Sequence, residues 1–203
     1  MSSAMAHEIA ATAARLVVDE GMEYAAAKRK AARLLGRQGA RSTELPSNEQ
    51  VEDEVRQHLA LFNADSQPAE LLALRRLAAL WMVRLAEFRP HLAGAVWRGT
   101  ATRLSVVHLD LYCDDAKSAE IALINQRVDY DVGSRSDPRG HLLDLLSIAA
   151  PCPDLGETVT LLLTIWDHDD LRGALKPDAR GRTWRGDEAA LKRLMATDHG
   201  LGD

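Results

Sequence analysis

The spacing of apolar residues changes at Pro90, and this change limits the fold more than any other feature. Before Pro90, apolar side chains recur every three or four residues, which predicts amphipathic helices. After it, short segments alternate apolar and polar residues, which predicts strands. The 203-residue chain is therefore expected to be an α+β protein. A helical N-terminal region over 1–90 precedes a small mixed-sheet domain, flanked by helices, over 91–203.

Four helices are expected in the first region. The first should end at Gly21 and the second at Gly36, because glycine readily enters the left-handed conformation that closes helices. Either Ser47 or Asn48 can cap the third. The clearest helix covers 68–90 and lies between two prolines. Its apolar stripe consists of Leu71, Leu74, Ala78, Trp81, Leu85 and Phe88.

The second region is expected to alternate strands with two helices. Its first two strands should be neighbours in the sheet, joined by a loop through Gly99. The expected strands are 93–97, 105–113, 128–133, 141–150 and 158–166, and the expected helices are 114–127 and 186–196.

Composition and charge exclude several classes of protein. Apolar residues make up 46% and charged residues 27% of the chain, as in globular proteins. The net charge of −5 argues against a general polyanion binder. No segment approaches the roughly 20 apolar residues of a membrane span, so we expect a soluble cytoplasmic protein without membrane partners. Cys113 and Cys152 are far apart and are expected to be free thiols.

Ionisable side chains interrupt the strand "SVVHLDLY". On one face of the strand, Val107, Leu109 and Leu111 are suited to a core. The other face carries His108 and Asp110, between Val106 and Tyr112. A buried carboxylate without partners is costly, so this face is a candidate functional site.

The stretch "GAVWRGTATRLSVVHLDLY" resembles the signature of the nucleotidyltransferase superfamily, the polymerase-beta-like fold. That signature has a glycine–serine pair, an inner glycine, a serine and then an Asp-x-Asp strand. Gly94 and Ala95 stand at the glycine–serine pair, Gly99 at the inner glycine and Ser105 at the serine. The resemblance covers residues 91–170. The chain as a whole also resembles a branch of bacterial proteins that combine "AKRKAARLLG" and "LPSNEQ" with this domain.

The resemblance implies a phosphate-binding loop beside strand carboxylates that hold two Mg²⁺ ions. It assigns nucleotide binding to Gly94, Ala95, Arg98, Gly99, Thr100, Arg103 and Ser105. Asp110 and His108 become the catalytic candidates, and His108 is alternatively a histidine that only bonds Asp110 or a loop amide. Metal-ligand candidates are Asp110, Asp129, Asp131 and Asp144.

The motif departs from the signature where the metal should bind. Val106 and His108 replace the two carboxylates, and hard Mg²⁺ selects oxygen ligands. We therefore expect a protein that binds a nucleotide or another phosphate ligand, with little or no nucleotidyl transfer.

The basic helix over 22–41 supports a second interpretation of the function. Lys28, Arg29, Lys30 and Arg33 lie in a run without acids, and such a run suits a nucleic-acid-binding regulator. A solvated helix face and a non-catalytic protein-interaction module are the other interpretations. The sequence leaves the oligomeric state open.

Overall fold

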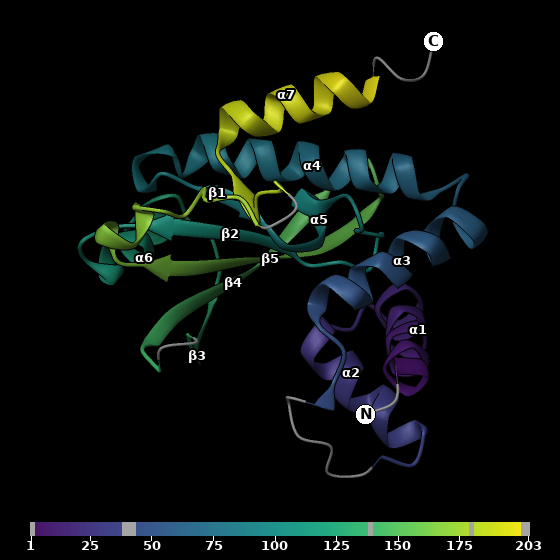
Figure 1. The fold of residues 1–203 in the computed structure, drawn as a ribbon. Helices are drawn as coiled ribbons and strands as arrows, with labels where there is room; N and C mark the ends of the chain where they lie inside the picture. Colours follow the sequence, from purple (N-terminus) through teal and green to yellow (C-terminus); the bar gives the residue numbers. More distant parts are fainter. Residues whose placement is uncertain (1–2, 38–43, 138–139, 179–180, 200–203) are drawn as a thin grey trace. The chain divides into compact units, whose positions relative to one another are not determined.

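A computed structural model describes residues 3–37, 44–137, 140–178 and 181–199 (Figure 1). The chain forms two compact units. Unit 1 holds Met1–Glu70 and Thr100–Ser105, and unit 2 holds Leu71–Gly99 and Val106–Asp203. The division therefore falls inside the helix that begins at Gln67.

Helices form the N-terminal part of the chain and a sheet follows Pro90, as the change of period predicts. The helices are α1 (Ser3–Glu20), α2 (Tyr24–Leu34), α3 (Asn48–Phe62), α4 (Gln67–Arg84), α5 (Gly94–Arg98), α6 (Ala116–Asn125) and α7 (Glu188–His199), with 3₁₀ turns η2 (Ala86–Phe88) and η3 (His168–Leu171). The strands are β1 (His91–Ala93), β2 (Val107–Tyr112), β3 (Asp131–Ser136), β4 (Leu142–Cys152), β5 (Glu157–Trp166) and β6 (Arg185–Gly186). The α+β prediction is confirmed.

Unit 1 is built on α1, α2 and α3, whose apolar faces share one buried cluster. Gly21 and Gly36 follow α1 and α2 with φ of 65° and 76°, so both predicted helix ends are confirmed. The third helix is capped by Ser47. Its Oγ accepts from the backbone N–H of Gln50, and the Gln50 side chain accepts from the Ser47 N–H in return. This reciprocal pair satisfies two donors that the helix leaves open.

Helix α4 supplies four residues of the predicted apolar stripe to the core of unit 2, and Leu85 and Phe88 follow the helix; all six residues of the stripe are buried. The helix ends at Arg84 rather than near Pro90, so the predicted range of 68–90 is too long. Arg89 has a left-handed φ of 48°, and the ring of Pro90 disfavours the helical conformation at Arg89. Within the described ranges, no helix has the length and apolar character that a membrane crossing requires. Cys113 and Cys152 are both free.

The described strands form one mixed sheet in the order β3-β4-β5-β2-β1-β6. Strands β2 and β5 are parallel, and the other neighbours are antiparallel. Val107, Leu109 and Leu111 are fully buried on one face. Leu161 and Leu163 of β5 pair with the first two and are buried with them. In Figure 1, α4 runs alongside this sheet.

The predicted strand at 93–97 is wrong, because the chain enters helix α5 at Gly94. Gly94 and Gly99 bracket this helix with φ of 67° and 79°, a conformation open mainly to glycine. Val96 and Arg98 are buried on it. The partner of β2 is instead β1, which pairs antiparallel with Ala93 opposite His108.

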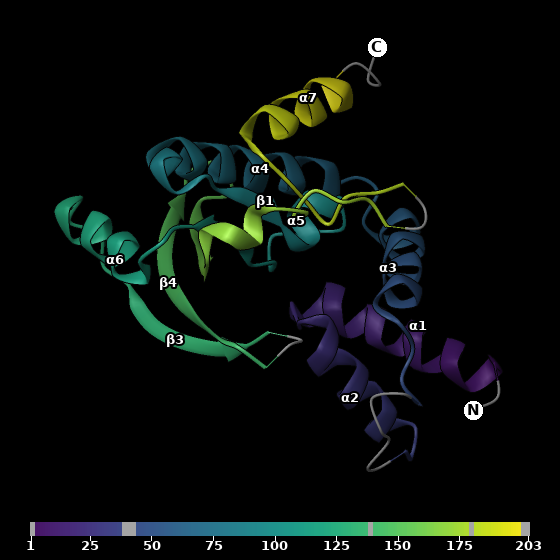
Figure 2. The same cartoon turned by 60° about the vertical axis from the view of Figure 1, so that its left-hand side comes forward.

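Strand β3 lies at the edge of the sheet and pairs only with β4 among the described strands. All six of its residues are exposed. The strand begins at Asp131 and continues to Ser136, three residues beyond the predicted end. Figure 2 shows the hairpin that it forms with β4.

We predict that Gly186→Ala destabilises unit 2. A Cβ on Gly186 would overlap three ring carbons of Trp97, and overpacking of this kind costs about 1–3 kcal/mol. Thermal unfolding followed by circular dichroism measures the effect. Gly133→Ala is the matched control, because its Cβ would meet Leu145 only at 3.8 Å. Equal melting temperatures for the two variants would contradict the packing described.

Candidate functional site

Ionisable and aromatic residues gather on one face of the sheet where β1, β2 and β5 run side by side. The register places His91 and Thr164 on either side of Asp110. The rings of His91 and Tyr112 pack in a T-shaped arrangement, with the centroids 5.2 Å apart. The predicted face of β2 therefore exists, and Asp110 lies at its centre.

Asp110 is a buried carboxylate with only 4% of its surface exposed, and both of its oxygens have partners. The Trp166 Nε1–H donates to Oδ1 at 2.9 Å. Arg185 Nη1 lies 2.9 Å from Oδ2 and also donates to the Tyr112 hydroxyl at 2.6 Å. A guanidinium thus neutralises this carboxylate and satisfies it by hydrogen bonding.

Burial raises the pKa of Tyr112 to about 12, and the charge of Asp110 adds to the shift while Arg185 opposes it. The phenol therefore stays protonated in the folded protein well above the ordinary range. It serves this cluster as a neutral hydrogen-bonding group.

The other metal-ligand candidates do not converge on Asp110. Asp144 pairs with Ile165, the neighbour of Thr164 in β5, so it lies on the opposite face of the sheet. Asp131 belongs to β3, which β4 and β5 separate from β2. Asp129 precedes β3 and is exposed. Within the described ranges, no group of three or more His, Cys, Asp or Glu side chains is arranged to hold a metal ion.

Four residues of the expected phosphate loop, Gly94, Ala95, Arg98 and Gly99, belong to unit 2 and contribute to helix α5 and its packing. Gly94 leaves room for the His108 ring, because a Cβ there would lie 3.0 Å from His108 Cδ2. Ala95 lies within α5, and Gly99 closes it. Arg98 is buried, donates to the Thr183 carbonyl and lies over the Trp184 ring.

The remainder of the expected loop belongs to unit 1. Thr100 is buried, with its hydroxyl 3.4 Å from that of Tyr24. The Arg103 backbone N–H donates to Glu70. Ser105 Oγ accepts from the Thr102 N–H. Phosphate binding by the seven residues of the expected loop stays a prediction.

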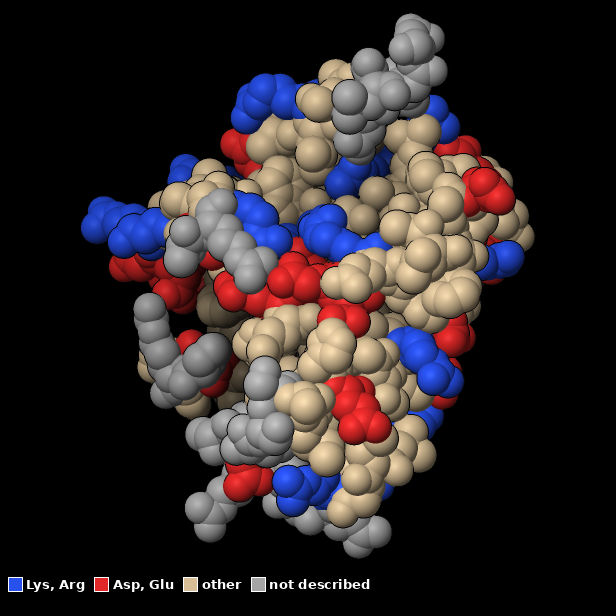
Figure 3. Space-filling model, turned by 45° about the vertical axis from the view of Figure 1, so that its right-hand side comes forward, with Lys and Arg blue, Asp and Glu red and all other residues tan. Residues whose placement is uncertain are grey.

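The basic run of α2 is partly neutralised. Lys28 donates to the Pro46 carbonyl at 3.1 Å and to Asn48 at 2.8 Å, and Lys30 pairs with Glu20 at 2.5 Å. Arg29 and Arg33 are exposed. On the face drawn in Figure 3, basic and acidic side chains are interspersed, and neither sign covers the face.

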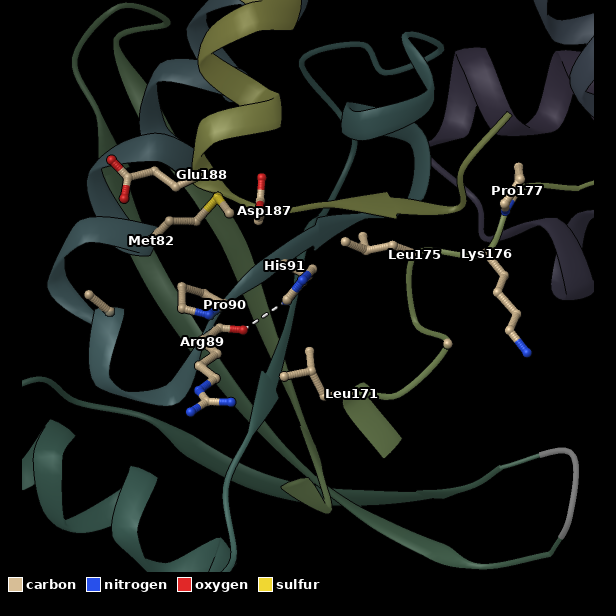
Figure 4. Close-up of a pocket in the computed structure, with 12 residues that line it drawn as sticks. Met82, Arg89, Pro90, His91, Leu171, Leu175, Lys176, Pro177, Asp187 and Glu188 are labelled. Atoms are coloured by element: carbon tan, nitrogen blue, oxygen red, sulfur yellow. Dashed lines mark hydrogen bonds between the residues drawn. The ribbon is translucent and has the colours of Figure 1, made fainter. Parts of the chain in front are cut away.

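A pocket of about 760 Å³ opens at the carboxyl ends of the parallel strands β2 and β5 (Figure 4). We call it the carboxyl-end pocket. Its lining comes from the end of α4, the start of β1, the segment after β5 and the start of α7. The lining residues are Met82, Ala86, Arg89, Pro90, His91, Leu171, Gly173, Leu175, Lys176, Pro177, Asp187 and Glu188.

The charged residues of this pocket differ in their partners. Asp187 Oδ1 accepts from the Ala190 N–H at the start of α7, and Glu188 pairs with Lys192 at 2.5 Å. Arg89 and Lys176 are exposed, and neither side chain pairs with another described residue. Figure 4 shows them on opposite sides of the pocket. The lining therefore carries two cations, Arg89 and Lys176, together with the carboxylate of Asp187 and the ion pair of Glu188 with Lys192.

His91 contributes the buried polar group of the carboxyl-end pocket. Its Nδ1 lies 2.8 Å from the Arg89 carbonyl oxygen. A carbonyl only accepts, so Nδ1 donates its proton in this hydrogen bond.

Reasoning from the sequence did not identify the carboxyl-end pocket. Asp110 is recognisable because it breaks an apolar strand, whereas Arg89, His91 and Lys176 lie next to prolines in segments without a motif.

Comparison of the chain with protein-family models, with curated proteins and with solved structures found no match in any of the three.

We predict that Tyr112 makes the stability of unit 2 fall at high pH. Its folded-state pKa of about 12 exceeds the ordinary 10.0, so the unfolded chain ionises first. The stabilisation is complete below pH 10 and is lost as the pH rises towards 12. At pH 11 the loss is about 1.4 kcal/mol. Chemical denaturation at pH 9 and pH 11 should show a smaller difference for Tyr112→Phe than for wild type. Tyr24→Phe should retain the wild-type difference, and an unchanged difference in Tyr112→Phe would contradict this assignment.

Proposed function

We propose that unit 2 binds a nucleotide or another phosphate-bearing small molecule in the carboxyl-end pocket, without a divalent metal ion. The observation that carries the proposal is a largely apolar cavity of about 760 Å³ whose lining includes Arg89 and Lys176, which pair with no other described residue, beside the acidic Asp187 and Glu188. Pockets for small ligands are typically 300–1,000 Å³, mostly apolar, with a few polar groups that set orientation.

The position of the pocket supports this proposal. In open sheets with helices, ligands bind outside the carboxyl ends of parallel strands, and β2 and β5 are the parallel pair here. Met82, Leu171 and Leu175 provide apolar surface for a base or another flat group. The second ring nitrogen of His91, Nε2, offers a polar contact for such a ligand. The resemblance of residues 94–112 to nucleotidyltransferases favours a nucleotide within this class.

Metal independence follows from the partners of Asp110. Both of its oxygens are engaged at 2.9 Å, one by Trp166 and one by Arg185. Mg²⁺ demands a near-ideal octahedron of oxygen ligands, and binding it here would require breaking the pair with Arg185. Lys176 and Arg89 supply positive charge for phosphates without an ion.

We predict that ATP binds to wild-type protein in the presence of EDTA and that Arg89→Gln and Lys176→Gln each weaken binding. Loss of one charge-assisted hydrogen bond should raise Kd by about tenfold. Isothermal titration calorimetry measures the change.

Arg193→Gln is the matched control, because Arg193 is an exposed arginine of α7 outside the pocket lining. It should bind as wild type does. Wild-type protein that fails to bind ATP, inorganic pyrophosphate and sugar phosphates would refute the proposed ligand class. Equal weakening in Arg193→Gln would move the binding site elsewhere.

We further predict that wild-type protein with ATP and Mg²⁺ releases no pyrophosphate above the blank, because Asp110 is held by Arg185 and no second carboxylate lies beside it on β2. A coupled phosphate assay with added pyrophosphatase measures this. Mg²⁺-dependent release that Asp110→Asn abolishes would instead make Asp110 the metal ligand of a working enzyme.

A further inference from the structure

Unit 1 carries a groove of about 390 Å³ along α2, which we call the arginine groove. Its apolar surface comes from Met22, Ala26, Ala32 and Leu45, and its charged side chains are Arg29, Arg33 and Arg37. None of the described residues that line the groove is acidic. The groove therefore combines an apolar surface with three positive charges.

The fold of α2 brings the three arginines to one groove. Arg29 and Arg33 are four residues apart, which places them on one side of the helix about 6 Å apart along its axis. The helix ends at Leu34, and Gly36 follows it with a left-handed φ of 76°. The Arg37 N–H then donates back to the Ala32 carbonyl at 2.8 Å. This turn brings Arg37 to the same groove as Arg29 and Arg33.

These arginines differ from the neighbouring lysines. Lys28 and Lys30 are engaged by Pro46, Asn48 and Glu20. The side chains of the three groove arginines form no ion pair or hydrogen bond with another described residue. Burial and the charge of Arg29 lower the pKa of Lys28, as expected next to uncompensated positive charge.

We propose that the arginine groove binds a phosphate ester that carries a small apolar group. Guanidinium groups bind phosphate oxygens through paired, charge-assisted hydrogen bonds, and several can share one phosphate. The apolar walls require an ester rather than bare phosphate. A volume of about 390 Å³ lies at the small end of the range for small-molecule pockets. A groove of this size, with both lysines engaged, favours a compact ester over a nucleic-acid backbone.

This site is separate from the proposed function. The arginine groove belongs to unit 1, whereas the carboxyl-end pocket belongs to unit 2, and they share no residue. Substitutions in one leave the lining of the other intact, so the variants of each site distinguish failure of one proposal from failure of the other.

The first test compares three probes by ³¹P and ¹H NMR titration of the full chain: phenyl phosphate, inorganic phosphate and phenol. Phenyl phosphate should bind at least about tenfold more tightly than inorganic phosphate, because its ring buries apolar surface as well. Phenol should not bind measurably. Wild-type protein that does not bind phenyl phosphate, or binds it no better than inorganic phosphate, would overturn the proposal.

Variants then locate the site. Arg29→Gln and Arg33→Gln should each weaken phenyl phosphate binding about tenfold. Ala26→Leu keeps every charge and fills the groove, so it should weaken binding as well. Arg15→Gln replaces an exposed arginine of α1 outside the groove and should bind as wild type does, with all melting temperatures compared. Loss of binding in Arg15→Gln, or full binding in Ala26→Leu, would overturn the site.

A last experiment identifies the source of the ester. If wild-type protein sediments with phosphatidylcholine vesicles containing phosphatidic acid, and phenyl phosphate releases it, the ester is a lipid headgroup. If phenyl phosphate binds and the vesicles do not, the ester is a free metabolite. Binding of a single-stranded oligonucleotide that Arg29→Gln weakens, without phenyl phosphate binding, would overturn the proposal in favour of a nucleic-acid surface.

Discussion

The pair formed by Asp110 and Arg185 is the contact on which unit 2 depends most. A carboxylate in the middle of a sheet costs several kcal/mol unless its charge is matched and its oxygens are bonded. Arg185 provides both and comes from β6, a strand of only two residues that pairs with β1. The ion pair links this short strand to the centre of the sheet, two residues before the start of α7. It therefore helps to hold β6 at the edge of the sheet, where only two residue pairs join β6 to β1.

The same pair determines which chemistry the site favours. A carboxylate without a protein partner could hold Mg²⁺ beside a substrate. Asp110 instead pairs with Arg185, and the same guanidinium donates to the neutral Tyr112 hydroxyl. The carboxyl-end pocket adjoins this cluster through His91, which contacts Tyr112. Its cations belong to the chain itself, so the phosphate binding that we propose there would not depend on metal supply.

Local signals in the sequence predicted a large part of the fold, because they act over one or two helical turns. Gly36 and Ser47 are examples, since each ends or begins a helix through contacts with near neighbours. The segment 93–97 was predicted wrongly because a five-residue apolar run suits a strand and a short helix equally. Asp110 was identifiable from its pattern, but its partner Arg185 follows far along the chain. The carboxyl-end pocket combines four separate segments, and no local pattern links them.

The exposed strand β3 has a consequence for how the protein behaves when concentrated. An edge strand presents unpaired backbone groups that can recruit a strand from another molecule. Here the single large apolar side chain of β3, Val132, lies between Asp131 and Gly133, and Arg135 follows. Charged side chains and a weak strand former discourage intermolecular pairing. The edge therefore carries its own protection against aggregation, and the sheet can end in solvent without a helix to cover it.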